Sequence, residues 1–97
     1  MNPFTGTFHN EEEKKSYDFT AEACYKISNL KPGERITYDE RKFAKGWEYN
    51  FNPNNHETPK SVMDKWLKFI WDNLKVRHWI DFANYRIYFH RVKEDNK

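Results

Sequence analysis

The clearest alternation of hydrophobic and polar positions lies in the second half of the chain. Apolar side chains recur there at steps of three and four residues, the spacing of one helix face: Met63, Trp66, Leu67, Ile70 and Leu74. Thr58 suits the N-cap, and Pro59 suits the first helical position because its missing N–H has no helical partner there. The pattern predicts a helix over 58–74.

After residue 75 the period of the pattern changes to two, the spacing of a strand. With Ala83-Asn84 as a two-residue turn, the pairing sets Trp79 opposite Tyr88. One face is then largely apolar and is expected to join the core: Ile80, Phe82, Tyr85, Ile87 and Phe89. The other face mixes basic and aromatic side chains: Arg77, Trp79, Arg86, Tyr88 and His90. We therefore predict a β-hairpin over 76–92.

The first half of the chain carries a second set of helix signals. Asn10 is a suitable N-cap before three glutamates, and Pro32-Gly33 ends the segment. A stripe of apolar residues lies between them: Phe19, Ala23, Ile27 and Leu30. A helix is expected over 11–30, and a start at Asp18 or Thr20 fits the pattern as well.

A short β-prone stretch at 36–38 follows and allows a third strand. Thr37 and Glu40 have the spacing of a capping box, which predicts a short helix over 39–45 with Gly46 as its C-cap.

The segment 46–57 is expected to be a long loop. Trp47, Tyr49 and Phe51 alternate within it, as side chains of an aromatic edge strand would. Residues 1–9 are expected to form a peripheral tail or a short strand, and 94–97 a frayed end.

Together these elements predict one α+β domain of 97 residues with three helices and a C-terminal hairpin. The chain has 8 Phe, 6 Tyr and 4 Trp, so the core is expected to consist of few, large side chains. The expected core is Phe19, Ala23, Ile27, Leu30, Met63, Leu67, Ile70, Leu74, Ile80, Ile87 and Phe89.

Cysteine usage and hydropathy bear on the compartment. Cys24 is the only cysteine, which excludes an internal disulfide and is typical of a reducing environment. No apolar run approaches the ~20 residues of a membrane span, and the N-terminus lacks the apolar stretch of a signal peptide. We expect a soluble cytoplasmic protein without a membrane partner.

The sequence contains no arrangement of residues typical of an enzyme. Cys24 has no cue to an activating base, so a buried, inert thiol is expected. The four histidines lack ligand spacing, and three glycines provide no phosphate-binding loop. We therefore expect no catalytic residues, no metal and no cofactor.

Charge is distributed unevenly along the chain. Residues 1–57 carry 8 Lys/Arg and 10 Asp/Glu, whereas residues 58–93 carry 8 Lys/Arg and 3 Asp. The helix and hairpin of the second half thus hold the positive charge, which favours an anionic partner, although an unevenly charged solvated surface explains it equally well.

The order helix, short strand, helix, helix, hairpin resembles the winged-helix family, and the phrase LKPGERITYDE at 30–40 resembles that family's join between its first two helices. The resemblance implies that the strand near Ile36-Thr37 joins the hairpin sheet. It also implies a recognition helix bearing Lys60, Ser61, Lys65 and Lys68, and a wing around Arg86. The segment 46–57 is longer than a tight helix-turn-helix join.

Two functions from different classes follow. The first is a nucleic-acid-binding protein, with duplex DNA as the expected ligand and these contact residues: Lys60, Ser61, Lys65, Lys68, Arg77, Trp79, Arg86 and Tyr88. RNA or a single strand bound by the hairpin aromatics is a variant of it. The second is a non-enzymatic protein-interaction module, such as a small phage-type inhibitor, with anchors at Trp47, Tyr49, Phe51 and Trp71. An aromatic patch at 47–51 would also suit a homodimer.

Overall fold

The computed structural model describes residues 10–49 and 58–93, and within them it confirms the predicted α+β fold class. The elements in chain order are α1 (Glu11–Ser28), β1 (Arg35–Asp39), α2 (Glu40–Gly46), the short 3-10 helix η1 (Trp47–Tyr49), α3 (Pro59–Leu74), β2 (Val76–Asp81) and β3 (Arg86–Arg91). The expected tails at 1–9 and 94–97, and the loop residues 50–57, lie outside the described residues.

Helix starts follow the predicted caps at α1 and α3. Asn10 Oδ1 accepts a hydrogen bond from Glu13 N at 2.9 Å. At α3, Thr58 Oγ1 accepts from Ser61 N at 3.1 Å while Ser61 Oγ accepts from Thr58 N at 2.9 Å, which completes a capping box. These bonds satisfy N–H groups that the first helical turn leaves without partners.

The predicted caps of α2 are wrong at both ends. Asp39, not Thr37, is the N-cap, and its Oδ1 accepts from Arg41 N at 2.9 Å and Lys42 N at 3.2 Å. Gly46 lies inside the helix, which Trp47 caps. A carboxylate can satisfy two backbone donors and also carries the charge that a helix N-terminus favours.

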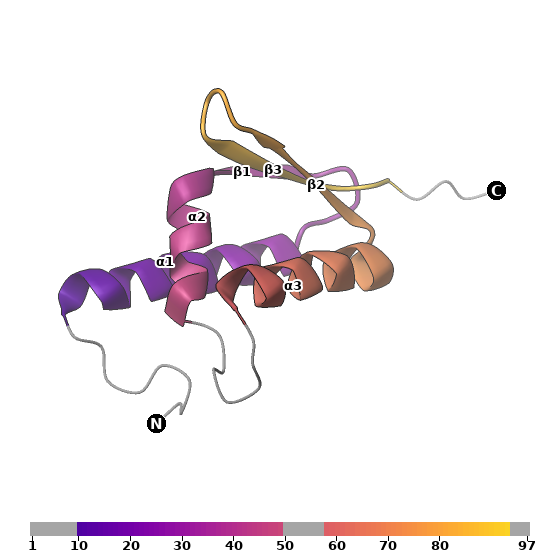
Figure 1. Cartoon of the computed structure of the whole chain (residues 1–97). Coiled ribbons are helices and arrows are strands. Elements are labelled where there is room, and N and C mark those ends of the chain that lie inside the picture. The colour runs from indigo at the N-terminus through magenta and orange to yellow at the C-terminus, as the bar shows by residue number, and fades with distance from the viewer. Residues whose placement is uncertain (1–9, 50–57, 94–97) are drawn as a thin grey trace.

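The predicted third strand is present. β1 and β2 both pair antiparallel with β3, so the sheet order is β1-β3-β2. All three helices lie on one side of this sheet, with α1 and α3 below it and α2 between (Figure 1). The sheet is thus covered on one face by helices, and no described element covers the other.

The hairpin register is the predicted one, with Trp79 opposite Tyr88 and Asp81 opposite Arg86. The turn is longer than predicted, because β2 ends at Asp81 and β3 begins at Arg86. Within this turn, Tyr85 takes the left-handed conformation, with φ of 55°. The prediction that Phe82 and Tyr85 join the core is wrong, since they lie in the turn beyond the sheet and are 73% and 49% exposed.

The buried core combines aliphatic and aromatic side chains, and it contains seven of the expected residues: Ala23, Ile27, Leu30, Leu67, Ile70, Ile87 and Phe89. Four expected residues are only partly buried: Phe19, Met63, Leu74 and Ile80. Three buried residues do not follow from the pattern: Phe43, Trp47 and Val76. Phe43 is the centre of a ring cluster, within 5.4–6.2 Å of the rings of Tyr38, Trp47, Trp66 and Phe89.

The buried Trp47 corrects a second expectation. Its side chain is 6% exposed and packs with Trp66 at a centroid distance of 5.7 Å. It is therefore a core residue and not an exposed interaction anchor. The aromatic patch expected at 47–51 consequently loses Trp47, and Phe51 lies outside the described residues.

Candidate nucleic-acid interface

The uncovered face of the sheet carries a regular array of side chains. Residues of this face alternate with the buried residues Ile87 and Phe89, so strand pairing fixes their positions. The register sets them in three rows across the sheet: Arg35, His90 and Arg77; then Thr37, Tyr88 and Trp79; then Asp39, Arg86 and Asp81. We call this array the outer face.

The middle row contains the aromatic pair predicted from the hairpin. The rings of Trp79 and Tyr88 stack at a centroid distance of 5.1 Å with an interplanar angle of 10°. Trp79 remains 42% exposed, because it lies on an edge strand with no described side chain beyond it in the row. The pair stabilises the sheet and at the same time presents an aromatic surface to solvent.

The first row is basic. Arg35 and Arg77 flank His90 on either side, and the row contains no carboxylate. Arg77 is a predicted contact residue, whereas Arg35 is not. The position of Arg35 on this face follows only from the pairing of β1 with β3. The order of the elements suggests this pairing, but the alternation of hydrophobic and polar residues does not predict it. Two exposed guanidinium groups beside an aromatic pair suit an anionic, planar ligand.

The third row changes the interpretation of Arg86. Asp39 and Asp81 lie on its two sides in the register. The pKa of Asp81 is below its usual range, chiefly because the Asn84 side chain donates to the carboxylate, and the charge of Arg86 lowers it further. Arg86 thus lies between two ionised carboxylates, which makes it a weaker phosphate contact than predicted.

The polar face of α3 is also largely neutralised. Lys60 Nζ lies 2.8 Å from Asp64 Oδ2, and Lys68 Nζ lies 2.7 Å from Asp72 Oδ2. Exposed pairs of this kind contribute little stability, roughly 0.3–0.5 kcal/mol each. They do place a carboxylate beside each of these two predicted phosphate contacts.

Two further predicted residues of α3 differ in what they offer a ligand. Ser61 Oγ accepts from Thr58 N and donates to Thr58 O at 2.9 Å, so its hydroxyl serves the cap. Lys65 is exposed on the helix surface.

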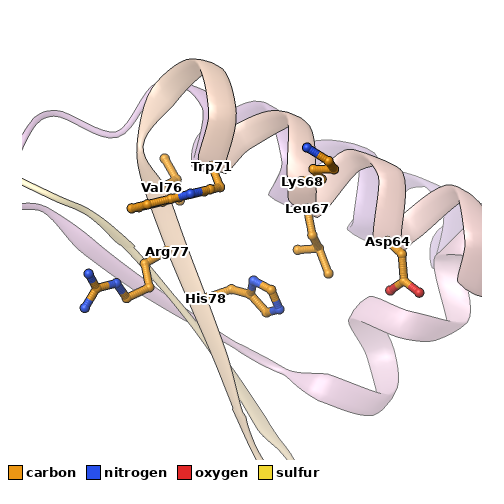
Figure 2. Close-up of a pocket in the computed structure, with 7 residues that line it drawn as sticks. All are labelled: Asp64, Leu67, Lys68, Trp71, Val76, Arg77 and His78. Carbon is orange, nitrogen blue, oxygen red and sulfur yellow. The ribbon is translucent and has the colours of Figure 1, made fainter.

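A cleft separates α3 from the hairpin. One part has a volume of about 420 Å³ and runs between α3 and the start of β2, lined by Leu67, Trp71 and His78 among others (Figure 2). A neighbouring part of about 650 Å³ shares Asp64, Leu67 and His78 with it and also contains Glu40 and Glu48. Burial lowers the pKa of His78, which favours its neutral form near pH 7. The carboxylates Glu40, Glu48 and Asp64 line the space between α3 and the hairpin.

The remaining predicted protein-interaction residues are dispersed. Trp71 is 41% exposed on α3, where Lys75 Nζ lies 5.0 Å from its ring centroid. Tyr49 is half-buried at the end of η1. The structure does not bring these two residues into one patch with Trp47, because the Trp47 ring belongs to the core.

Other chemistry in the described residues is sparse. Burial raises the pKa of the Cys24 thiol to about 12, as expected for an unreactive side chain. No group of three His, Cys, Asp or Glu within residues 10–49 and 58–93 is placed to hold a metal ion. No helix among these residues has the length and apolar composition to cross a membrane.

Comparisons with protein-family models, with curated proteins and with solved structures gave no match to this chain. No matched protein supports the resemblance to the winged-helix family, which is inferred from element order alone. Fold-level likeness does not fix function, so the chemistry of the outer face carries more weight than the fold.

Proposed function

We propose that this chain is a nucleic-acid-binding protein that contacts a flexible single strand through the outer face of its sheet. The observation that carries the proposal is the stacked pair Trp79–Tyr88 beside the row Arg35, His90 and Arg77. Aromatic side chains stack with unpaired bases, and arginines bind the backbone phosphates that connect those bases.

The spacing of the side chains on the outer face suits a single strand of nucleic acid that runs across the sheet. Successive rows are two residues apart along the strands, or about 6.8 Å, so the basic row and the aromatic row lie within the reach of neighbouring phosphates and bases. Base–aromatic stacking contributes about 1–3 kcal/mol per base. Binding would tolerate many sequences, because every base has a flat face.

Duplex DNA bound by α3 and the wing has less support. In that arrangement the phosphate backbone would pass the helix and the hairpin, where the cleft contains Glu40, Glu48 and Asp64. Like charges brought together in such an interface weaken binding substantially. The pairs Lys60–Asp64 and Lys68–Asp72 further reduce the positive charge of the helix.

A protein-interaction module is the second candidate, favoured by the same cleft. Met63, Ile80 and the exposed Phe82 give it apolar walls, while Glu40 and Glu48 make it acidic. Its chemistry would suit a partner segment that combines apolar and basic residues.

Titration of labelled oligonucleotides tests the proposal. Single-stranded DNA, single-stranded RNA and a duplex of the same sequence are titrated at two salt concentrations, with fluorescence anisotropy as the readout. We expect tighter binding of the single strands, with a salt slope of about −0.7 per neutralised phosphate. Trp79→Ala should weaken this binding. Phe69→Ala is the control, because its ring is 51% exposed on α3, whereas the Trp71 ring lies 5.9 Å from the Arg77 guanidinium.

Two results would count against the proposal. Equal losses from Trp79→Ala and Phe69→Ala would show that the stacked pair does not contribute specifically to binding. No binding of any nucleic acid at low salt by the folded protein would favour the interaction module instead.

A further inference from the structure

β2 forms an edge of the sheet. In the part of the chain that the structure describes, β3 is the only strand that pairs with it. Natural edge strands are commonly protected by proline, charged side chains or a bulge. β2 reads VRHWID and pairs in unbroken register, so it has no proline or bulge, and its two charged side chains, Arg77 and Asp81, have opposite signs.

The hydrogen-bonding groups of this edge can be assigned by alternation. Val92 N donates to Lys75 O at 2.9 Å, which makes this opposed pair a hydrogen-bonded one. Antiparallel pairs alternate, so the backbone groups of Arg77, Trp79 and Asp81 are directed toward β3. Those of the residues between, Val76, His78 and Ile80, are directed away from the sheet. The edge therefore offers alternating N–H and C=O groups to an additional strand.

We propose that this edge binds a second copy of the chain, β2 against β2, about a two-fold axis at Trp79. His78 of one copy then forms the two backbone hydrogen bonds with Ile80 of the other, because both residues direct their groups outward. Trp79 faces Trp79 of the second copy as a non-hydrogen-bonded pair, in which side chains lie closest. This interface uses Trp79 and Arg77, which also belong to the proposed nucleic-acid site, so it is tested without nucleic acid.

Charge complementarity selects this register. The two-fold axis sets Arg77 of each copy opposite Asp81 of the other, so the same pair forms twice. Shifting the strands by two residues preserves the hydrogen bonds, but it sets Arg77 or Asp81 opposite Trp79. Asp81 already accepts from Ala83 N, Asn84 N and Asn84 Nδ2. A carboxylate has about four acceptor positions, so one remains for the arginine.

The surroundings of the edge accommodate a second strand. On the outer face, the two aromatic rows would meet at Trp79, which is 42% exposed in the single chain. On the inner face, Figure 2 shows His78 directed toward α3 and Arg77 directed to the opposite side of β2. The cleft beside His78, with parts of about 420 and 650 Å³, offers room for inner-face side chains of the second copy.

The opposite edge provides an internal comparison. β1 also begins with an arginine, Arg35, and ends with an aspartate, Asp39. α2 begins at Glu40, directly after Asp39, so the chain turns from the strand into a helix at that end of the edge. The middle of β1 carries a threonine where β2 has a tryptophan. β1 is therefore the poorer docking edge, and Arg35 is the matched control position.

Sedimentation velocity over a range of protein concentrations, without nucleic acid, tests the proposal. The wild type should dimerise. Arg77→Asp and Asp81→Lys should each weaken the dimer roughly tenfold or more, because like charges then face each other twice. An equimolar mixture of the two variants should dimerise again, since position 77 of each copy then faces the opposite charge at position 81 of the other. Arg35→Asp should leave the dimer unchanged.

Asp81→Lys also removes hydrogen bonds of the hairpin turn, so a second variant tests the edge without changing Asp81. His78→Pro removes an outward N–H that β3 does not use, so it should give a monomer whose circular dichroism remains that of the wild type. A monomeric wild type at the highest concentration would overturn the proposal. So would a mixture of folded charge variants that stays monomeric, or a dimer that Arg35→Asp disrupts and His78→Pro does not.

Discussion

Gly46 packs directly against Thr20 where α2 crosses α1. A Cβ atom at Gly46 would meet the side chain of Thr20 and the carbonyl oxygen of Ser16. The buried Thr20 Oγ1 donates to Phe43 O at 2.9 Å in the same crossing. Glycine is therefore needed for the close approach of two helices rather than for a helix end.

Substitution of Gly46 by Ala should destabilise the protein. The added methyl group forces the helices apart or displaces the Thr20 hydroxyl, and overpacking of this kind costs about 1–3 kcal/mol. Urea unfolding followed by circular dichroism measures the change. Lys45→Ala, on the exposed side of α2, should stay within about 0.5 kcal/mol of the wild type. Equal stability of the two variants would show that the crossing can relax.

Phe43→Ala should be among the most damaging single truncations. Its ring is fully buried at the centre of the aromatic cluster, and loss of such a side chain costs about 3–5 kcal/mol. Phe82→Ala is the matched control, since the same side chain is 73% exposed in the hairpin turn and its loss should change stability little. Comparable destabilisation by the two changes would contradict the assignment of the core.

Stability should decrease in acid, partly through Asp39 and Asp81. Hydrogen bonds to these carboxylates, led by Lys42 N for Asp39 and by the Asn84 side chain for Asp81, hold each pKa below its usual value. The stabilisation is fully present above the unfolded pKa of about 3.9 and is lost as the pH falls through the folded pKa.

The variant Asp39→Asn isolates one of these two groups. The amide oxygen still caps α2 but does not titrate, so the acid dependence should become shallower. Unfolding curves between acidic and neutral pH measure it. An unchanged dependence in the variant would mean that Asp39 contributes nothing to the acid sensitivity.

Much of this fold follows from local pattern. The period of 3.6 locates α3, and the period of two gives the hairpin register, because each pattern repeats over a whole element. The position of Phe43 in the core does not follow from pattern, because α2 is too short to show a periodic face. The positions of Phe82 and Tyr85 do not follow either, because turn length depends on which residue adopts the left-handed conformation, here Tyr85.

The site was predictable only in part, for a related reason. Trp79, Tyr88 and Arg77 follow from the hairpin alone, since their strands are neighbours in sequence. Arg35 joins them through pairing between β1 and β3, which are separated in sequence by α2, η1, α3 and β2. The predicted hairpin register already sets Asp81 beside Arg86, but Asp39 joins the row through the distant β1, so the sequence alone does not reveal the second carboxylate.

The most direct test compares the outer face with α3 by removing equal charge from each. Arg35→Gln/Arg77→Gln and Lys60→Gln/Lys68→Gln both remove two positive charges, and each is titrated with the same labelled single strand at two salt concentrations. If the outer face binds the strand, the arginine variant loses roughly tenfold or more in affinity and its salt slope flattens by about 0.7 per lost phosphate contact. The lysine variant should change little. The reverse order of losses would place the nucleic acid on α3 and contradict binding at the outer face.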